Sequence, residues 1–581
     1  MRGHHYKFNP QKHKIKNDYP DNAERNGTST LRRHLVICKG MPSKFIEMSE
    51  MLAQDEMIIA KKIDGMMVRK FLAMAIIEHD LPFSFVEYKR VRQLLKYMNP
   101  DFNPISRNTI VADVLRLHQG QKEKLKREIA SISNRICLTA DVWRSIAIEG
   151  YICITGHYVD NSWKLNSKIL SFSAMPPPHS GNELAKKVLD CLKDWGIEKK
   201  IFSLTLDNAS ANDTMQSILK DQLCLQYGLL CDGKFFHVRC YAHILNLIVQ
   251  EGLKVVDSAL YKIRESVKYV KWSEGRMKMF KEYCEQVGVE TGTGLHLDIP
   301  TRWNSTYTML KVAIKYERAF SSLQLLDRSY KYNPSSQEWQ RGEKICDFLE
   351  PFYEITNLFF GSKYPTSNLY FFQVWRIECL LKDYMTNGED EMIESMANNM
   401  KEKFDKYWEE YNITFALAAV LDPRMKLELL EFAYNEVDPT NSKEKIDIVF
   451  KAYERRTAAQ EERSALEIYL DDKRLEMNEF DDIDVLQFWK NHKQRYGNLT
   501  QMACDILSIP ITTVASESSF SIGSRLLNKY RSRLCSSNVE ALICTRNWLI
   551  GYEIGVNGEE CDGEDNDHIE VVVDDDTGKN T

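Results

Sequence analysis

The sequence lacks the features that mark membrane and secreted proteins. It has no run of about 18 consecutive apolar residues, the length that a membrane-spanning helix needs, so we expect no membrane partner. The N-terminus, MRGHHYKF, has no apolar segment of the kind found in secretory signals. None of the 14 cysteines forms a CxxC pair, and this thin spread favours reduced thiols in the cytosol or nucleus over a disulfide scaffold.

The apolar content is sufficient for several hydrophobic cores. Of the 581 residues, 43% are hydrophobic and 11% are aromatic, which excludes wholesale disorder. At about 150 residues per domain, this length corresponds to roughly four domains.

Charge is distributed unevenly along the chain. Residues 556–581 carry a net charge of −9, whereas the whole chain carries −6, so the remainder is slightly basic. We interpret 552–581 as an acidic disordered tail and 1–45 as a flexible basic arm. A basic body does not exclude nucleic acid as a partner.

The segment 131–240 predicts a mixed α/β core. Its alternating apolar and polar residues indicate strands, and a helix closed by Gly196 interrupts them. The expected elements are strands at 136–143, 150–159 and 163–172, a helix at 183–195 and a strand at 201–206.

Helical sequence surrounds this core. Residues 46–130 and 241–484 show mainly helical periodicity, and the C-terminal unit 485–551 contains two further helices, near 514–530 and 537–550. Ser537 and Glu540 have the spacing of a capping box for the last helix. The sequence therefore predicts an α/β core combined with all-α regions.

Two aspartates stand at the ends of predicted strands. Asp141 lies on the polar face of strand 136–143, and Asp207 follows strand 201–206 directly. If these strands are neighbours, the two carboxylates converge at the edge where α/β sheets bind ligands. Carboxylates bind Mg²⁺, and two metals about 4 Å apart support phosphodiester cleavage. The alternative is that each aspartate only ends a strand or begins a turn.

Glu517 lies in a serine-rich segment, 514–520 (VASESSF). A lone glutamate at the start of a helix usually complements the helix dipole, and its residues alone favour that role.

Five segments in order carry a resemblance to a known family. They are 138–143 (LTADVW), 205–213 (TLDNASAND), 239–247 (RCYAHILNL), 300–306 (PTRWNST) and 514–521 (VASESSFS). Together they resemble the hAT superfamily of transposases, and within it the plant zinc finger BED group that includes the RICESLEEPER and DAYSLEEPER proteins. The resemblance extends over residues 27–551.

The resemblance implies an RNase H-like core interrupted by a long helical insertion, here 241–484, and completed by the C-terminal unit. It also implies a catalytic triad of two aspartates and a glutamate that binds Mg²⁺ or Mn²⁺ for DNA cleavage and strand transfer. The matching residues are Asp141, Asp207 and Glu517.

Two smaller motifs are implied to lie near this site. Cys240 and His243 match the family's CxxH motif and could form half of a zinc site, although a packed or hydrogen-bonded role is the alternative. Arg302 and Trp303 match its RW motif. The tryptophan could stack on an unpaired base, or it could be a core residue beside a surface arginine.

Residues 27–38 (GTSTLRRHLVIC) resemble the second half of a BED zinc finger. His34 and Cys38 match its last two ligands, and Arg32 and Arg33 would face DNA. Two ligands do not close a tetrahedral structural site, so we expect no complete zinc site here.

The C-terminal unit resembles the family's dimerisation region, so a homodimer or higher homo-oligomer is implied. Its apolar residues, which include Val539, Leu542 and Ile543, could instead cover the core of the same chain. Lys529, Arg531 and Arg533 form a basic strip that is either a solvated face or a phosphate-contacting surface.

The leading hypothesis is a nuclear, transposase-derived, DNA-binding protein that self-associates and has become a regulator of transcription. An active metal-dependent transposase or nuclease is the second hypothesis, since all three acids are present. A helical scaffold that binds no DNA is the third. No small-molecule substrate is expected.

Overall fold

The structure is a computed structural model, and the described residues form two compact units. It describes residues 64–145, 149–226, 228–290, 292, 294–361, 364–388, 390–408, 413–437, 464–475, 483–527 and 534–552. The smaller unit contains the described residues up to Phe71 and the segment Lys89–Pro104, and the larger unit contains Leu72–Tyr88 and all that is described from Ile105 onward. None of the described helices is both long and apolar enough to span a bilayer.

Helices make up the N-terminal part of the described chain. They are α3 (Gly65–Glu78), the short 3-10 helix η2 (Phe83–Glu87), α4 (Lys89–Met98) and α5 (Arg107–Ser131). The side chain of Ser106 caps α5 by accepting a hydrogen bond from the backbone N–H of Thr109.

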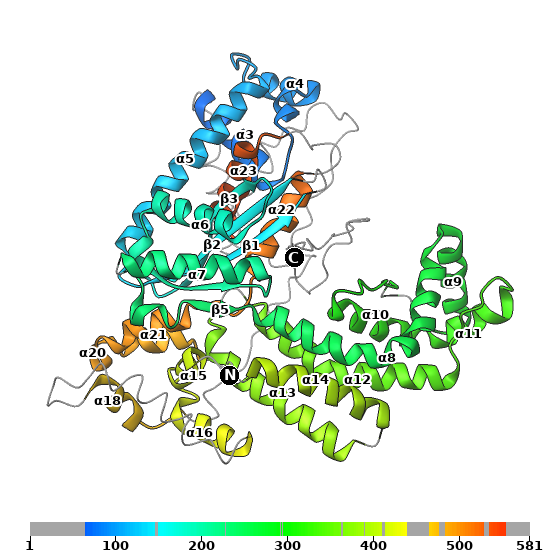
Figure 1. The fold of residues 1–581 in the computed structure, drawn as a ribbon. Coiled ribbons are helices and arrows are strands. Elements are labelled where there is room, and N and C mark those ends of the chain that lie inside the picture. Colours follow the sequence, from blue (N-terminus) through cyan, green and yellow to red (C-terminus); the bar gives the residue numbers. More distant parts are fainter. Residues whose placement is uncertain are drawn as a thin grey trace, which may run out of the picture. The chain divides into compact units, whose positions relative to one another are not determined.

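The larger unit is built on one five-stranded sheet with the strand order β3-β2-β1-β4-β5 (Figure 1). The strands are β1 (Ile136–Arg144), β2 (Gly150–Val159), β3 (Leu165–Met175), β4 (Ile201–Leu206) and β5 (His237–Arg239). β1, β2 and β3 pair antiparallel, whereas β4 runs parallel to β1 and β5 runs parallel to β4. Helices α6 (Gly181–Trp195) and α7 (Ser210–Leu225) supply the crossovers that parallel strands require.

The alternation of β1 separates two hydrophobic cores. Leu138 and Ala140 belong to the core that α6 and α7 cover. On the opposite face, Trp143 packs against helices α22 (Val514–Leu526) and α23 (Ser536–Ile550). The sheet therefore lies between two helical layers, one of which comes from the C-terminal unit.

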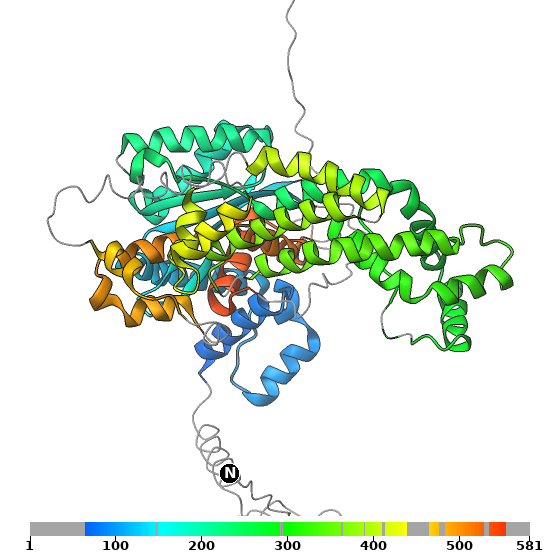
Figure 2. The same cartoon turned by 90° about the horizontal axis from the view of Figure 1, so that it is seen from below.

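A long run of helices lies between β5 and α22 in the sequence. These are α8 (Tyr241–Lys271), α9 (Glu274–Gln286), α10 (Trp303–Lys315), α11 (Glu317–Leu326), α12 (Ser336–Phe359), α13 (Ser367–Asn387), α14 (Glu391–Trp408), α15 (Ile413–Val420), α16 (Lys426–Val437), α18 (Ala465–Asp471), α19 (Val485–Asn491), α20 (Lys493–Tyr496) and α21 (Leu499–Leu507). α8, α12, α13 and α14 run side by side in both views (Figures 1 and 2) and share one core.

Helix α22 packs closely on the sheet. The ring of Phe520 stacks on Trp143 with the ring centroids 5.8 Å apart. A Cβ atom at Gly523 would lie 3.2 Å from the Trp143 ring and 3.3 Å from Phe172. Glycine at this position is what lets the helix approach the aromatic side chains of β1 and β3.

The structure confirms the expected mixed α/β core with helical sequence on either side. The expected helix at 183–195 is α6, which Gly196 ends in the left-handed conformation with a φ of 66°. The third strand reaches Met175 instead of Phe172.

The capping box predicted for the last helix is wrong. α23 begins at Ser536, its N-cap residue is Cys535, and no side chain caps it. Glu540 instead accepts a hydrogen bond of 3.4 Å from the hydroxyl of Ser171. The glutamate is therefore engaged by β3 and not by the start of its own helix.

Candidate active site

Asp141 and Asp207 come from neighbouring strands of the sheet. β1 and β4 pair in parallel, with Thr139 opposite Thr205, and each aspartate follows two residues later. The condition that the two strands be neighbours is therefore met, and both carboxylates lie toward the C-terminal ends of parallel strands.

The carboxylate of Asp141 interacts with two other acids. Burial is the main cause that raises its pKa well above the ordinary value of 3.8, and the negative charges of Glu517 and Asp207 raise it further. The structure thus brings Glu517 of α22 within electrostatic reach of an aspartate almost four hundred residues earlier in the sequence. In the absence of a cation, Asp141 therefore holds its proton to a higher pH than an exposed aspartate does.

Hydrogen bonds orient each aspartate. Asp141 Oδ1 accepts a bond of 2.7 Å from the backbone N–H of Val142. Asp207 Oδ1 accepts a bond of 3.1 Å from the backbone N–H of Ala209 and a short bond from the side-chain amide of Asn212. Because Asn212 is 8% exposed, its amide is a rigid support for Asp207 at the start of α7.

Glu517 is connected to Cys240 through Thr513. The Thr513 hydroxyl donates a hydrogen bond of 3.0 Å to Glu517 Oε1 and lies 3.3 Å from Cys240 Sγ. The backbone N–H of Thr513 also donates to Cys240 Sγ at 3.4 Å. Burial, together with the charge of Glu517, raises the pKa of the Cys240 thiol to about 11. Cys240, the N-cap residue of α8, is therefore a neutral hydrogen-bonded thiol, and His243 lies half-buried in the first turn.

The three acids supply the ligand type that hard divalent cations prefer. Carboxylate oxygens suit Mg²⁺ and Mn²⁺, and a cation would offset the repulsion that raises the Asp141 pKa. In the part of the chain that the structure describes, no three His, Cys, Asp or Glu side chains are grouped closely enough to hold one ion. The donor set fits a divalent cation in type and charge, and Asp141, Asp207 and Glu517 are the residues that would hold it.

We expect Asp141→Asn to change how the stability of the metal-free protein depends on pH. Between the ordinary aspartate pKa of 3.8 and the raised value, the folded protein holds a proton that the unfolded chain has released. The stability of wild type should therefore fall as pH rises through this window. The stability of the variant should fall less, because its amide does not titrate. Thermal unfolding in EDTA at several pH values measures this difference.

The same variant should gain less stability than wild type when Mn²⁺ is added, because one carboxylate and its charge are gone.

The pH experiment has a clear contrary outcome. If the stability of wild type and of Asp141→Asn depends on pH in the same way in EDTA, the pKa of Asp141 is not raised.

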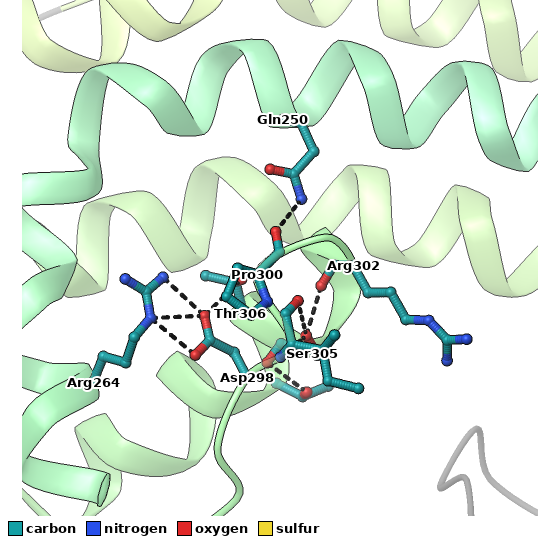
Figure 3. A network of polar contacts seen from close by, with 9 residues as sticks. Gln250, Arg264, Asp298, Pro300, Arg302, Ser305 and Thr306 are labelled. Carbon is teal, nitrogen blue, oxygen red and sulfur yellow. Dashed lines mark hydrogen bonds and ion pairs between the residues drawn. The ribbon is translucent and has the colours of Figure 1, made fainter. Parts of the chain in front are cut away.

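Arg302 and Trp303 have different surroundings. Trp303 is 2% exposed and packs edge-on against Tyr353, with the ring centroids 6.5 Å apart, so its ring is a core group and offers no stacking surface here. Arg302 is exposed, and its side chain extends away from Asp298, which pairs with Arg264 (Figure 3).

The turn that carries Arg302 is held against α8. Asn246 donates a hydrogen bond of 3.1 Å to the carbonyl of Thr301, and Gln250 donates one of 2.8 Å to the carbonyl of Pro300 (Figure 3). Asn246 follows Cys240 by six residues, so about 9 Å of helix separates this turn from the Cys240–Thr513 contact. The structure therefore fixes the turn that carries Arg302 on the helix that follows Cys240.

A second arginine lies beside Asn208, the residue that follows Asp207. Arg239 pairs with Leu206 across β4 and β5, and its guanidinium donates a hydrogen bond of 3.5 Å to the side-chain oxygen of Asn208. Sequence reasoning identified neither Arg239 nor Asn212 as a site residue. Both lie inside the motifs that it singled out, and Asn212 stands one turn into the helix that follows Asp207.

Seven predicted site residues lie outside the described residues. They are Arg32, Arg33, His34, Cys38, Lys529, Arg531 and Arg533. Their proposed contacts with DNA or zinc stay predictions.

Family models match four consecutive parts of the chain. They are the ZBED1 RNase-like domain at residues 139–235, the ZBED1 RNase-like helical domain at 238–348, the hAT-like transposase, RNase-H fold, at 368–456 and the hAT family C-terminal dimerisation region at 465–549. Most of the sheet lies in the first match, whereas the match at 368–456 covers a helical part of this structure.

Curated plant proteins are similar to most of the chain. Zinc finger BED domain-containing protein RICESLEEPER 2 from Oryza sativa subsp. japonica is 32% identical over 82% of this chain and 74% of its own length. The putative AC transposase of Zea mays is 34% identical over 91% of this chain and 71% of its own length. Zinc finger BED domain-containing protein DAYSLEEPER from Arabidopsis thaliana is 31% identical over 83% of this chain and 73% of its own length.

Proposed function

We propose, from the premise that this chain belongs to the hAT transposase family, that it is a transposase-derived DNA-binding protein of the nucleus that pairs with a second copy of itself. The observation that carries the proposal is the meeting of distant family motifs at one place. Asp141, Asp207 and Glu517 interact there, and Thr513 connects the glutamate to Cys240.

Two arginines support DNA as the ligand. Arg239 contacts Asn208, the residue after Asp207, and Arg302 is presented on a turn fixed to α8. Guanidinium groups match phosphate geometry, and contacts to phosphates bind DNA without reading its sequence. The basic arm at 1–45 would add further phosphate contacts.

A salt titration of DNA binding tests this proposal. We expect the full chain to bind duplex DNA in a filter assay at low salt, with an affinity that falls steeply as salt rises. Arg302→Ala should lower the slope of the logarithm of the binding constant against the logarithm of salt concentration by about one, the contribution of one phosphate contact.

Arg318→Ala is the matched control, because Arg318 is an exposed arginine on α11, which lies at the far end of α8 from β5 (Figure 1). Its slope should equal that of wild type. The absence of DNA affinity at low salt would overturn the proposed function.

Self-association is proposed through the C-terminal region, 465–549. The apolar face of α23 is already used within the chain, since Val539 is 0%, Leu542 3% and Ile543 0% exposed. A second copy would therefore bind exposed residues of this region, or would displace α23 from the sheet of its own chain.

The helical run α8–α21 is proposed to be an insertion in an RNase H-like core. The support is the position of α22. This helix follows α8–α21 in the sequence and yet packs on β1. The sheet and α22 therefore form one layered unit, although the helical run separates them in the sequence. If the protein binds DNA and does not cut it, we propose that it acts as a regulator of transcription.

An active metal-dependent transposase or nuclease is the second candidate, and the electrostatic interaction of Asp141 with both Glu517 and Asp207 favours it. Mg²⁺ or Mn²⁺ would activate water and stabilise the leaving oxygen of a phosphodiester. Asn212 would hold Asp207 in place, and Thr513 would hold Glu517. Zinc is not part of the proposal, because His34 and Cys38 supply two of the four ligands of a structural site.

A further inference from the structure

Four side chains, three of them buried, form a continuous polar chain from β3 to α22. The Ser167 hydroxyl lies 3.1 Å from His157 Nδ1, and His157 Nε2 lies 3.2 Å from the Thr139 hydroxyl. The Thr139 hydroxyl lies 3.0 Å from that of Ser516. Thr139 and Ser516 are 0% exposed and His157 is 7% exposed. The polar chain therefore crosses strands β3, β2 and β1 and reaches α22, the helix that carries Glu517.

The protonation state of His157 suits this chain. Burial lowers its pKa to about 3, so the ring is neutral near neutral pH. A neutral imidazole has one donor and one acceptor nitrogen, and each faces a hydroxyl that can take the complementary role. Both nitrogens of the ring have a hydrogen-bond partner, so the polar chain is directional and rigid.

Helix α22 is tied to the sheet just before its first residue, where the Thr205 hydroxyl donates to the carbonyl of Pro510 and Thr513 contacts Cys240, and the polar chain adds a contact from within the helix. The helices α8–α21 separate it in sequence from β5. Its apolar contacts, such as Phe520 on Trp143, are non-directional and would tolerate a small slide. A shift of one residue moves a helical side chain by about 1.5 Å and turns it by about 100°. Such a shift would carry Glu517 away from Asp141.

We propose that His157 is a positioning residue that sets the register of α22, and so holds Glu517 opposite Asp141. Ser516 precedes Glu517 directly, and Thr139 shares a strand face with Asp141, so the polar chain joins helix and strand beside the two carboxylates. The inference rests on the proposed metal-binding role of the acids.

The first test is the affinity of the full chain for Mn²⁺, measured from the electron paramagnetic resonance signal of free Mn²⁺. Loss of a group that supports a ligand costs about 10- to 100-fold in metal affinity, and we expect a loss in that range for His157→Phe. His157→Gln keeps one donor and one acceptor, so it should recover most of the affinity.

Ser516→Ala removes the hydroxyl at the α22 end of the polar chain, so it should also weaken Mn²⁺ binding. Ser524→Ala is the control on the same helix, because that hydroxyl donates to the carbonyl of Phe520 within α22. It should bind Mn²⁺ as wild type does.

The second test needs no metal. Amide hydrogen exchange in EDTA should be faster across α22 in His157→Phe and Ser516→Ala than in wild type, and His157→Gln should restore slow exchange. If wild type binds no Mn²⁺ and exchange still rises in both variants, the metal site fails and the positioning role stands. Unchanged exchange in α22 of both variants, or equally fast exchange in His157→Gln and His157→Phe, overturns the positioning role.

Discussion

Asp207→Asn is expected to reduce Mg²⁺- or Mn²⁺-dependent nicking of supercoiled plasmid by more than about 100-fold. Loss of a group that only supports a metal ligand costs up to about 100-fold, and Asp207 is proposed to be a ligand itself. The substitution keeps the size of the side chain and removes its charge. DNA binding measured in EDTA should be at least as strong as in wild type, because the substitution removes a negative charge that repels phosphate.

Asp213→Asn is the control for this experiment. Asp213 is an exposed carboxylate in the first turn of α7, within the same sequence motif as Asp207. Nicking that survives in Asp207→Asn would come from another site or from a contaminating nuclease. A wild-type protein that binds DNA and does not nick it would favour the regulator over the nuclease.

The sheet and its two faces could be predicted from the sequence because they follow from local periodicity. Alternation in 136–143 assigned Leu138 and Ala140 to one face and Asp141 to the other, and the structure confirms that division. The turn chemistry of Gly196 ended α6 as expected. β5 was missed because three residues are too few to show a period of two.

The third acid could not be found from local pattern. Glu517 reads as an ordinary glutamate in the first turn of a helix, and only the family resemblance connected it with the aspartates. The physical link is a set of long-range contacts, such as Thr139 with Ser516 and Thr513 with Cys240. Contacts of this kind leave no periodic trace in either segment.

The burial of polar residues in the sheet likewise could not be predicted from the sequence. His157 and Thr139 occupy polar positions in alternating strands, where a solvated face is the usual reading. In the structure that face is covered by α22, whose Ser516 and Ser519 are 0% exposed. The serine-rich start of this helix is therefore the complement of the polar face of the sheet.

Asp298→Ala is expected to destabilise the helical region by about 3 kcal/mol. The Asp298 side chain is 0% exposed, and its two oxygens accept bonds of 2.9 and 3.0 Å from Arg264 Nε and one of 2.8 Å from Arg264 Nη2. Thr306 of α10 donates a further bond of 3.0 Å (Figure 3). Removing one partner of a buried ion pair costs about 3–5 kcal/mol, and we expect the lower end because Arg264 is 22% exposed.

Native-state hydrogen exchange at the α10 amides measures this loss. About 3 kcal/mol corresponds to roughly a 100-fold fall in protection. Glu354→Ala is the matched control, since its ion pair with Arg376 joins side chains that are 58% and 46% exposed. Exposed pairs contribute about 0–1 kcal/mol, so this variant should exchange nearly as wild type does.

The same substitution should also affect DNA binding, because Asp298 lies at the base of the turn that ends in Arg302. Once the Arg264 and Thr306 contacts are gone, the turn keeps its contacts to Asn246 and Gln250 and the hydrogen bonds of Ser305, but it loses the ion pair at its base. Asp298→Ala should therefore lower the salt slope of DNA binding toward that of Arg302→Ala, although it leaves the arginine in place. If protection in α10 falls and the salt slope does not, the Asp298–Arg264 pair stabilises the helices without positioning Arg302.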